Sequence, residues 1–149
     1  MEEMDQRTEQ QVWKQVFDRP MQPRGDSLRE LLMTASELAA GYRYLLGQVG
    51  ERQKSRVRLL YEGETANAAS LRGISFLRHE GEELLKLWAP AGASLGKLLE
   101  TSYHRTRQAW VEYTARSGDP EFGIVFRKLA QREENHCLLL TELLGMKLR

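Results

Sequence analysis

The sequence predicts an all-α protein built as a bundle of four long helices, and three observations favour this class. Apolar side chains recur every three or four residues through four long segments, which is the spacing of one helix face. The 149 residues include only 4 prolines, so long stretches lack the residue that breaks helices. Two of the three connections are short and one is long, a pattern found among helical bundles.

Residues 1–25 are expected to form a short amphipathic helix and a linker in front of the bundle. Trp13 and Phe17 share the apolar side of a helix over residues 3–17, and Pro20 ends it. We expect this helix to pack across the outside of the bundle. A helix that binds a partner protein is the alternative.

The bundle is expected over residues 26–149. Its first helix starts at Asp26 or Ser27, because Glu30, three residues after Ser27, completes the sequence pattern of a capping box. Gly47 marks the end of this helix.

The other three helices are expected at residues 52–79, 94–116 and 120–145. Residues 81–96 interrupt the apolar repeat for too long to be a tight hairpin, so we expect a crossover there. Pro120 suits the first position of the last helix.

Composition and charge exclude several classes of function. With 22 Lys and Arg against 21 Asp and Glu, the net charge of +1 offers no electrostatic attraction for a nucleic acid. No apolar run approaches the roughly 18 residues of a membrane span. The single cysteine, Cys137, excludes an intramolecular disulfide, and together with the lack of a recognisable signal sequence it leads us to expect a cytoplasmic protein.

Two polar residues interrupt the apolar face of the last predicted helix. Glu133 and His136 lie three residues apart, in a repeat that continues from Phe126 to Leu140. Burial of an unpaired carboxylate costs several kcal/mol unless the group is paired, protonated or bound to a metal. The motif therefore predicts either a metal site or a hydrogen-bonded pair in the core.

The second predicted helix carries a matching interruption. Glu64 and Asn67 lie at the same spacing in its stripe of apolar residues. Two polar interruptions of the same spacing, on two helices, strengthen the prediction that these residues have a role in the core.

These residues resemble the rubrerythrin-like branch of the ferritin-like proteins, over about residues 27–146. The similar segments are Glu37 to Tyr44 for the first helix of that branch, residues 60–64 for the approach to its second-helix motif, and Ser117 to His136 for its final helix. The resemblance implies an up-down-down-up four-helix bundle with a long crossover between its second and third helices. No pair of cysteines is present to form a rubredoxin domain.

Members of that family hold two iron ions with six side chains. The residues at the six corresponding positions, taken in chain order, are Glu37, Glu64, Asn67, Tyr103, Glu133 and His136. Asn67 replaces an expected histidine and Tyr103 replaces an expected glutamate. Asn67 offers only a neutral amide oxygen, and Tyr103 a phenol that must lose its proton to bind strongly. The resemblance therefore implies one or two iron ions, or none where the site has degenerated.

Two functions follow from this reading. The first is a metal-binding protein that handles iron or reduces peroxide, in which case it is a non-haem iron oxidoreductase that needs an external electron donor. The second is a metal-free bundle that serves as a structural or protein-interaction module. Bundles of this family also pair into homodimers.

Overall fold

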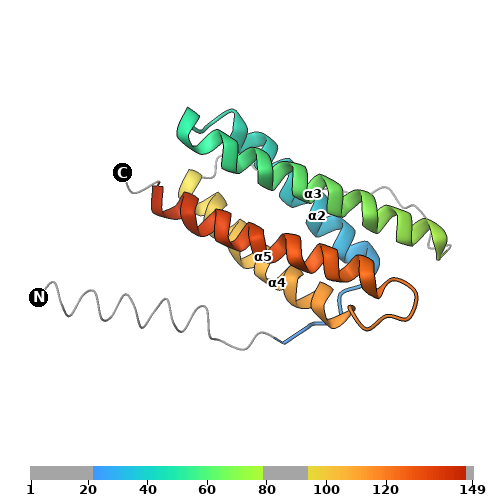
Figure 1. Cartoon of the computed structure of the whole chain (residues 1–149). Helices are drawn as coiled ribbons and strands as arrows, with labels where there is room; N and C mark the ends of the chain where they lie inside the picture. The colour runs from blue at the N-terminus through green and yellow to red at the C-terminus, as the bar shows by residue number, and fades with distance from the viewer. Residues whose placement is uncertain (1–21, 79–93, 147–149) are drawn as a thin grey trace, which may run out of the picture.

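The computed structural model describes residues 22–78 and 94–146, which form four helices and no strand. The helices are α2 (Leu28–Leu46), α3 (Glu51–Leu77), α4 (Leu95–Ala115) and α5 (Gly123–Met146). They pack side by side as a four-helix bundle (Figure 1). The all-α, four-helix class predicted from the sequence is confirmed. The helix expected over residues 3–17 and most of the connection expected over residues 81–96 lie outside the described residues.

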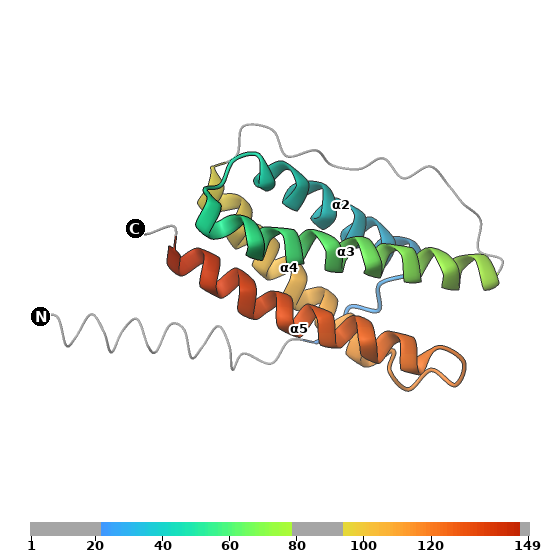
Figure 2. The same ribbon diagram turned by 45° about the horizontal axis from the view of Figure 1, so that its top comes forward.

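The bundle consists of two helical hairpins. α2 packs on α3 and α4 packs on α5, and the hairpins meet where α3 faces α5 and α2 faces α4 (Figure 2). Arg56 near the start of α3 pairs with Glu142 near the end of α5, and Arg78 after α3 pairs with Asp119 before α5. α3 and α5 are therefore antiparallel.

α2 and α4 are antiparallel as well. Glu112, near the end of α4, accepts hydrogen bonds from the backbone N–H groups of Arg24 and Asp26, just before α2 begins. Because α2 runs opposite to both α3 and α4, α3 and α4 run in the same direction. The end of α3 and the start of α4 therefore lie at opposite ends of the bundle.

The helix starts follow local side-chain chemistry. Ser27 caps α2 and forms the predicted capping box with Glu30. α5 begins three residues later than expected, at Gly123 rather than Pro120. The reason is that the Asp119 carboxylate accepts hydrogen bonds from the N–H groups of Glu121 and Phe122, which holds residues 120–122 as a separate turn.

The buried apolar side chains form two clusters, each with residues from all four helices. The first cluster, near the start of α2 and α5, includes Leu31, Leu71, Tyr113 and Phe126, and the second, at the other end of the bundle, includes Leu45, Leu60, Leu99 and Leu140. Between them along each helix lies a layer that includes buried polar side chains.

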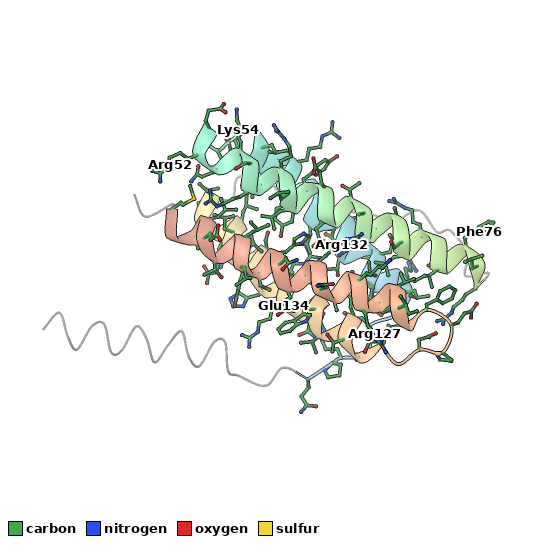
Figure 3. All side chains as sticks on the ribbon, in the orientation of Figure 1. Arg52, Lys54, Phe76, Arg127, Arg132 and Glu134 are labelled. Atoms are coloured by element: carbon green, nitrogen blue, oxygen red, sulfur yellow. The ribbon has the colours of Figure 1, made fainter. Side chains whose placement is uncertain are left out.

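Charged side chains cover the outer surface of the bundle. Arg52 at the start of α3 and Arg127 and Glu134 on α5 are exposed (Figure 3). Each helix therefore has one apolar face and one polar face. Within residues 22–78 and 94–146, no helix combines the length and the apolar character that a membrane crossing requires.

Candidate metal centre

The polar layer is centred on the two matched motifs of α3 and α5. Because residues at positions i and i+3 share a helix face, Glu64 and Asn67 both point from α3 toward α5, where Glu133 and His136 face them. All four residues are at least 96% buried. Charged residues are rarely buried this deeply unless something offsets their desolvation.

His136 lies between the two carboxyl groups. Its Nδ1 atom is 3.0 Å from Oε1 of Glu64 and 3.4 Å from Oε1 of Glu133. One ligand atom from each of the three residues lies within 4.8 Å of the other two. Two acidic groups and one imidazole therefore converge on one buried point.

One oxygen of each carboxyl group is left without a partner. Among the described residues, neither Oε2 of Glu64 nor Oε2 of Glu133 has a hydrogen-bond partner, although both atoms are buried. Such an atom loses its hydration and gains no replacement, at a cost of about 1–3 kcal/mol. The pair is therefore incomplete in terms of hydrogen bonding.

The electrostatics of the pair favour a proton or a cation. Burial raises the pKa of the Glu133 carboxyl well above its ordinary value, and the charge of the neighbouring Glu64 raises this pKa further. A positive charge between the two carboxyl groups would have the opposite effect.

Asn67 donates a hydrogen bond to Glu133. Its amide nitrogen donates a 2.8 Å hydrogen bond to Oε1 of Glu133, which lowers the pKa of that carboxyl and partly opposes the effect of burial. Its amide oxygen accepts a 3.1 Å hydrogen bond from Arg132, whose side chain extends from α5 toward α3 (Figure 3). The structure therefore directs the NH2 group of Asn67, and not its oxygen, toward the carboxyl pair.

Two further residues proposed from the sequence make contacts with other side chains. Glu37 forms an ion pair with Arg105 of α4, with 3.2 Å between Oε1 and the guanidinium nitrogen. Tyr103 is buried in the second apolar cluster and stacks edge-on against His104. Within the described part of the chain, the group of possible metal ligands contains Glu64, Glu133 and His136, without Glu37.

Sequence reasoning missed two buried tyrosines whose pKa values are affected by the charges of the carboxyl pair. Burial raises the pKa of Tyr42 and of Tyr113 well above the usual value, and the charges of Glu64 and Glu133 raise both further. The hydroxyl groups of Tyr42 and Thr106 are 3.3 Å apart and share a hydrogen bond. Thr106 gave a signal in the sequence, since it interrupts the apolar stripe of α4, whereas Tyr42 reads as an ordinary core residue.

Cys137 follows His136 in the sequence but lies outside the cluster of possible metal ligands found among the described residues. Burial raises the pKa of its thiol to about 12, so the thiolate that a metal would bind is disfavoured. Its sulfur is not among the clustered ligand atoms of the described residues.

The donor set fits a transition-metal ion. Metal–ligand bonds of about 2.0–2.2 Å place neighbouring donor atoms about 3.0–3.6 Å apart. The distances from Nδ1 of His136 to the two carboxylate oxygens, 3.0 and 3.4 Å, fall in this range. The unpartnered oxygens could also act as ligands of such a metal. The residues present therefore fit one ion.

Comparison with known proteins adds no family assignment. No protein-family model matches the chain, and neither the curated proteins nor the solved structures contain a significant match. The resemblance to the rubrerythrin-like branch therefore stays a prediction from residues 27–146.

Proposed function

We propose that this protein is a rubrerythrin-like member of the ferritin-like class, which binds one divalent transition-metal ion, in our assignment iron, between α3 and α5. The ligands in this proposal are Glu64, Glu133 and His136. The observation that carries it is the pair of buried carboxylate oxygens, Oε2 of Glu64 and Oε2 of Glu133, for which the described residues provide no partner.

Charge balance supports one ion. Two carboxylates and a neutral imidazole carry a total charge of −2, which one divalent cation neutralises. A second ion would need further acidic ligands, and Glu37 is instead paired with Arg105. The proposal is therefore a centre with one metal ion, in place of the two that the resemblance implies.

The chemistry of the ligands supports iron or manganese. Carboxylate and imidazole donors suit both metals, and imidazole also suits zinc and copper. Bound iron would supply one-electron redox chemistry toward a small oxidant such as peroxide. Glu64, Glu133 and His136 would hold the ion, Asn67 would orient Glu133, and the two apolar clusters would exclude water. Electrons would come from an external donor.

The directions of the helices support the ferritin-like assignment. α3 and α4 run in the same direction, and the connection between them has to start and finish at opposite ends of the bundle. The up-down-down-up order of the ferritin-like class has this property.

Metal binding by protein purified without oxygen tests the proposal. We expect close to one equivalent of Fe(II) per chain, and a melting temperature that rises as Fe(II) is added. A ligand that binds only the folded state, at one hundred times its Kd, stabilises it by about 2.7 kcal/mol. Elemental analysis and thermal unfolding measure the two effects.

The variant Glu133→Gln separates metal binding from folding. It keeps the oxygen that accepts the hydrogen bond from Asn67 and removes the buried charge. We expect the metal-free variant to be at least as stable as the wild type, but to lose the Fe(II)-dependent rise. Glu37→Gln is the matched control and should retain the rise. Equal responses of the two variants to Fe(II) would contradict the proposal.

A metal-free bundle that serves as a structural or interaction module is the second candidate, and one observation favours it. Asn67 and His136 already give each carboxyl group of the pair one polar neighbour. A proton on Glu133 would then remove the repulsion without a metal. This candidate requires a melting temperature that is the same with Fe(II), with Mn(II) and with a chelator.

A further inference from the structure

Gly63 occupies a position where a helix would ordinarily carry a side chain. It lies in the middle of α3, directly before Glu64, and it is half-buried. Glycine lowers the stability of a helix relative to alanine, because it loses more conformational freedom on folding. The helical backbone does not require glycine here, since the only positive φ angle among the described glycines is that of Gly25.

The space beside Gly63 is filled by the imidazole of His136. A Cβ atom on Gly63 would lie 2.5 Å from Cε1 of His136 and closer still to Nε2. Any side chain at this position therefore requires the ring to move. By contrast, a Cβ atom on Gly73, also in α3, would meet nothing within 4 Å.

The ring has little freedom to move. Its Nδ1 atom is fixed by the contacts with Glu64 and Glu133, and the side chain is 5% exposed. A rotation that takes Nε2 away from α3 would carry Nδ1 away from the carboxyl groups. Oε1 of Glu64 would then lose its hydrogen-bond partner as well.

We propose that Gly63 is a positioning residue for the metal centre. The absence of a side chain lets the imidazole of His136 lie against the α3 backbone, with Nε2 and Cε1 at Gly63 and Nδ1 directed at the two carboxyl groups. The position of the His136 ring against Gly63 is a property of the metal-free protein. Its consequence for metal binding rests on the proposed function.

The melting temperature of the metal-free protein tests whether the His136 ring packs against Gly63. Gly73→Ala should raise it by about 2–4 °C, as alanine normally does in an exposed helical position of a protein this size. Gly63→Ala should lower it, although the same atom is added to the same helix. If Gly63→Ala raises the melting temperature as Gly73→Ala does, the imidazole of His136 does not occupy the space beside Gly63.

A second variant background, His136→Asn, shows whether His136 causes the decrease in melting temperature expected for Gly63→Ala. Asparagine lacks atoms equivalent to Cε1 and Nε2, the two that a Cβ on Gly63 would meet first, but keeps a polar atom near the position of Nδ1. In the His136→Asn background, Gly63→Ala should therefore raise the melting temperature. A decrease in both backgrounds would assign the loss to other neighbours and overturn the proposal.

Co(II), whose visible absorption reports its ligands, tests the consequence for the site. We expect Gly63→Ala to weaken Co(II) binding by about 10–100-fold, the usual effect of disturbing the support of a metal ligand. Gly73→Ala should leave the affinity and the spectrum unchanged. Unchanged affinity in Gly63→Ala would overturn the positioning role. The wild type could bind no metal while the melting temperatures follow the expected pattern. In that case the packing of His136 against Gly63 is supported and the proposed function fails.

Discussion

At the residue scale, the central feature is a carboxyl group that burial makes hard to ionise. The pKa of Glu133 is raised by burial and by Glu64, and the hydrogen bond from Asn67 lowers it. A proton or a metal ion relieves the same repulsion. The two therefore compete for one position, and metal binding has to release a proton where Glu133 is protonated.

The contribution of Glu133 to the stability of the metal-free protein should fall as the pH rises above about 4.3, the value at which glutamate ionises in an unfolded chain. Because the pKa of Glu133 is higher in the folded state, the folded state binds more protons, and its advantage is lost as the pH rises toward the folded-state pKa. Urea unfolding between pH 4 and pH 8 in the presence of a chelator measures this slope.

Two variants isolate the contribution of Glu133 to that slope. Glu133→Gln should gain stability relative to the wild type as the pH rises, because it removes the group that ionises unfavourably. Glu134→Gln, its exposed neighbour on α5, should follow the wild type. A parallel pH dependence in all three proteins would show that the pKa of Glu133 is not raised in the folded state.

Asn67 should contribute to stability through its hydrogen bond with Glu133. Asn67→Leu keeps the approximate size of the side chain and removes the donor, so we expect the free energy of unfolding to decrease by about 1–3 kcal/mol. Denaturant titration measures the change. Asn135→Leu, an exposed position on α5, should change it by less than about 0.5 kcal/mol. Similar losses in both variants would argue against a specific role for Asn67.

At the element scale, the antiparallel packing of α3 and α5 brings the two motifs together. Arg56 and Glu142 lie at one end of this pair, Arg78 and Asp119 at the other, and Asn67 bonds Glu133 between them. A slip by one residue would turn the facing side chains about 100° around the helix axis. The contacts along the helix pair therefore set the register on which the site depends.

Asp119 is the residue whose charge we expect to matter most at the junction of α3 and α5. The hydrogen bond from Arg78, together with those from the N–H groups of Phe122 and Glu121, lowers the pKa of Asp119 to about 2. A lowered pKa means that the charged form stabilises the fold, and that this contribution is lost as the pH falls through about 2.

The variant Asp119→Asn should therefore be less stable than the wild type above about pH 4, the ordinary range of aspartate ionisation. The difference should shrink as the pH falls toward 2, where the wild type also loses the charge. Thermal unfolding of both proteins across this range measures it. Glu100→Gln, an exposed position on α4, serves as the control. A difference that is independent of pH would mean that the charge of Asp119 is not responsible.

At the scale of the whole molecule, the candidate site separates two apolar clusters that each involve all four helices. Neither hairpin contains a complete cluster, so the hairpins stabilise each other. We expect the bundle to unfold as one cooperative unit, which is usual for a single domain of this size.

Three leucines of α5 test the contribution of the two clusters. Leu129 belongs to the first cluster and Leu140 to the second, and both are fully buried, whereas Leu138 is 62% exposed. Leu129→Ala and Leu140→Ala should each lower the free energy of unfolding by about 2–5 kcal/mol in a single transition. Leu138→Ala should have little effect. Two separate transitions in either core variant would show that the clusters unfold independently.

Much of this molecule follows from local patterns in the sequence. The apolar repeats predict four helices, and Ser27 with Glu30 predicts the start of the first, because these signals act over a few residues and the structure retains them. The shared spacing of Glu64 with Asn67, and of Glu133 with His136, predicts two polar interruptions that face the core. Helical geometry alone is enough for that prediction.

Tertiary structure decided which of these side chains meet. Glu37 carries the sequence pattern of a ligand, but Arg105, 68 positions away in the chain, holds its carboxylate in an ion pair. Tyr42 has no such pattern, yet burial raises its pKa and the charges of the two carboxyl groups raise it further. The space that His136 occupies at Gly63 also depends on the packing of α3 on α5. The sequence by itself determined the helices and the polar residues of their inner faces, because both depend on local spacing. The partners of those residues depend on distances between helices, and only the folded chain decides them.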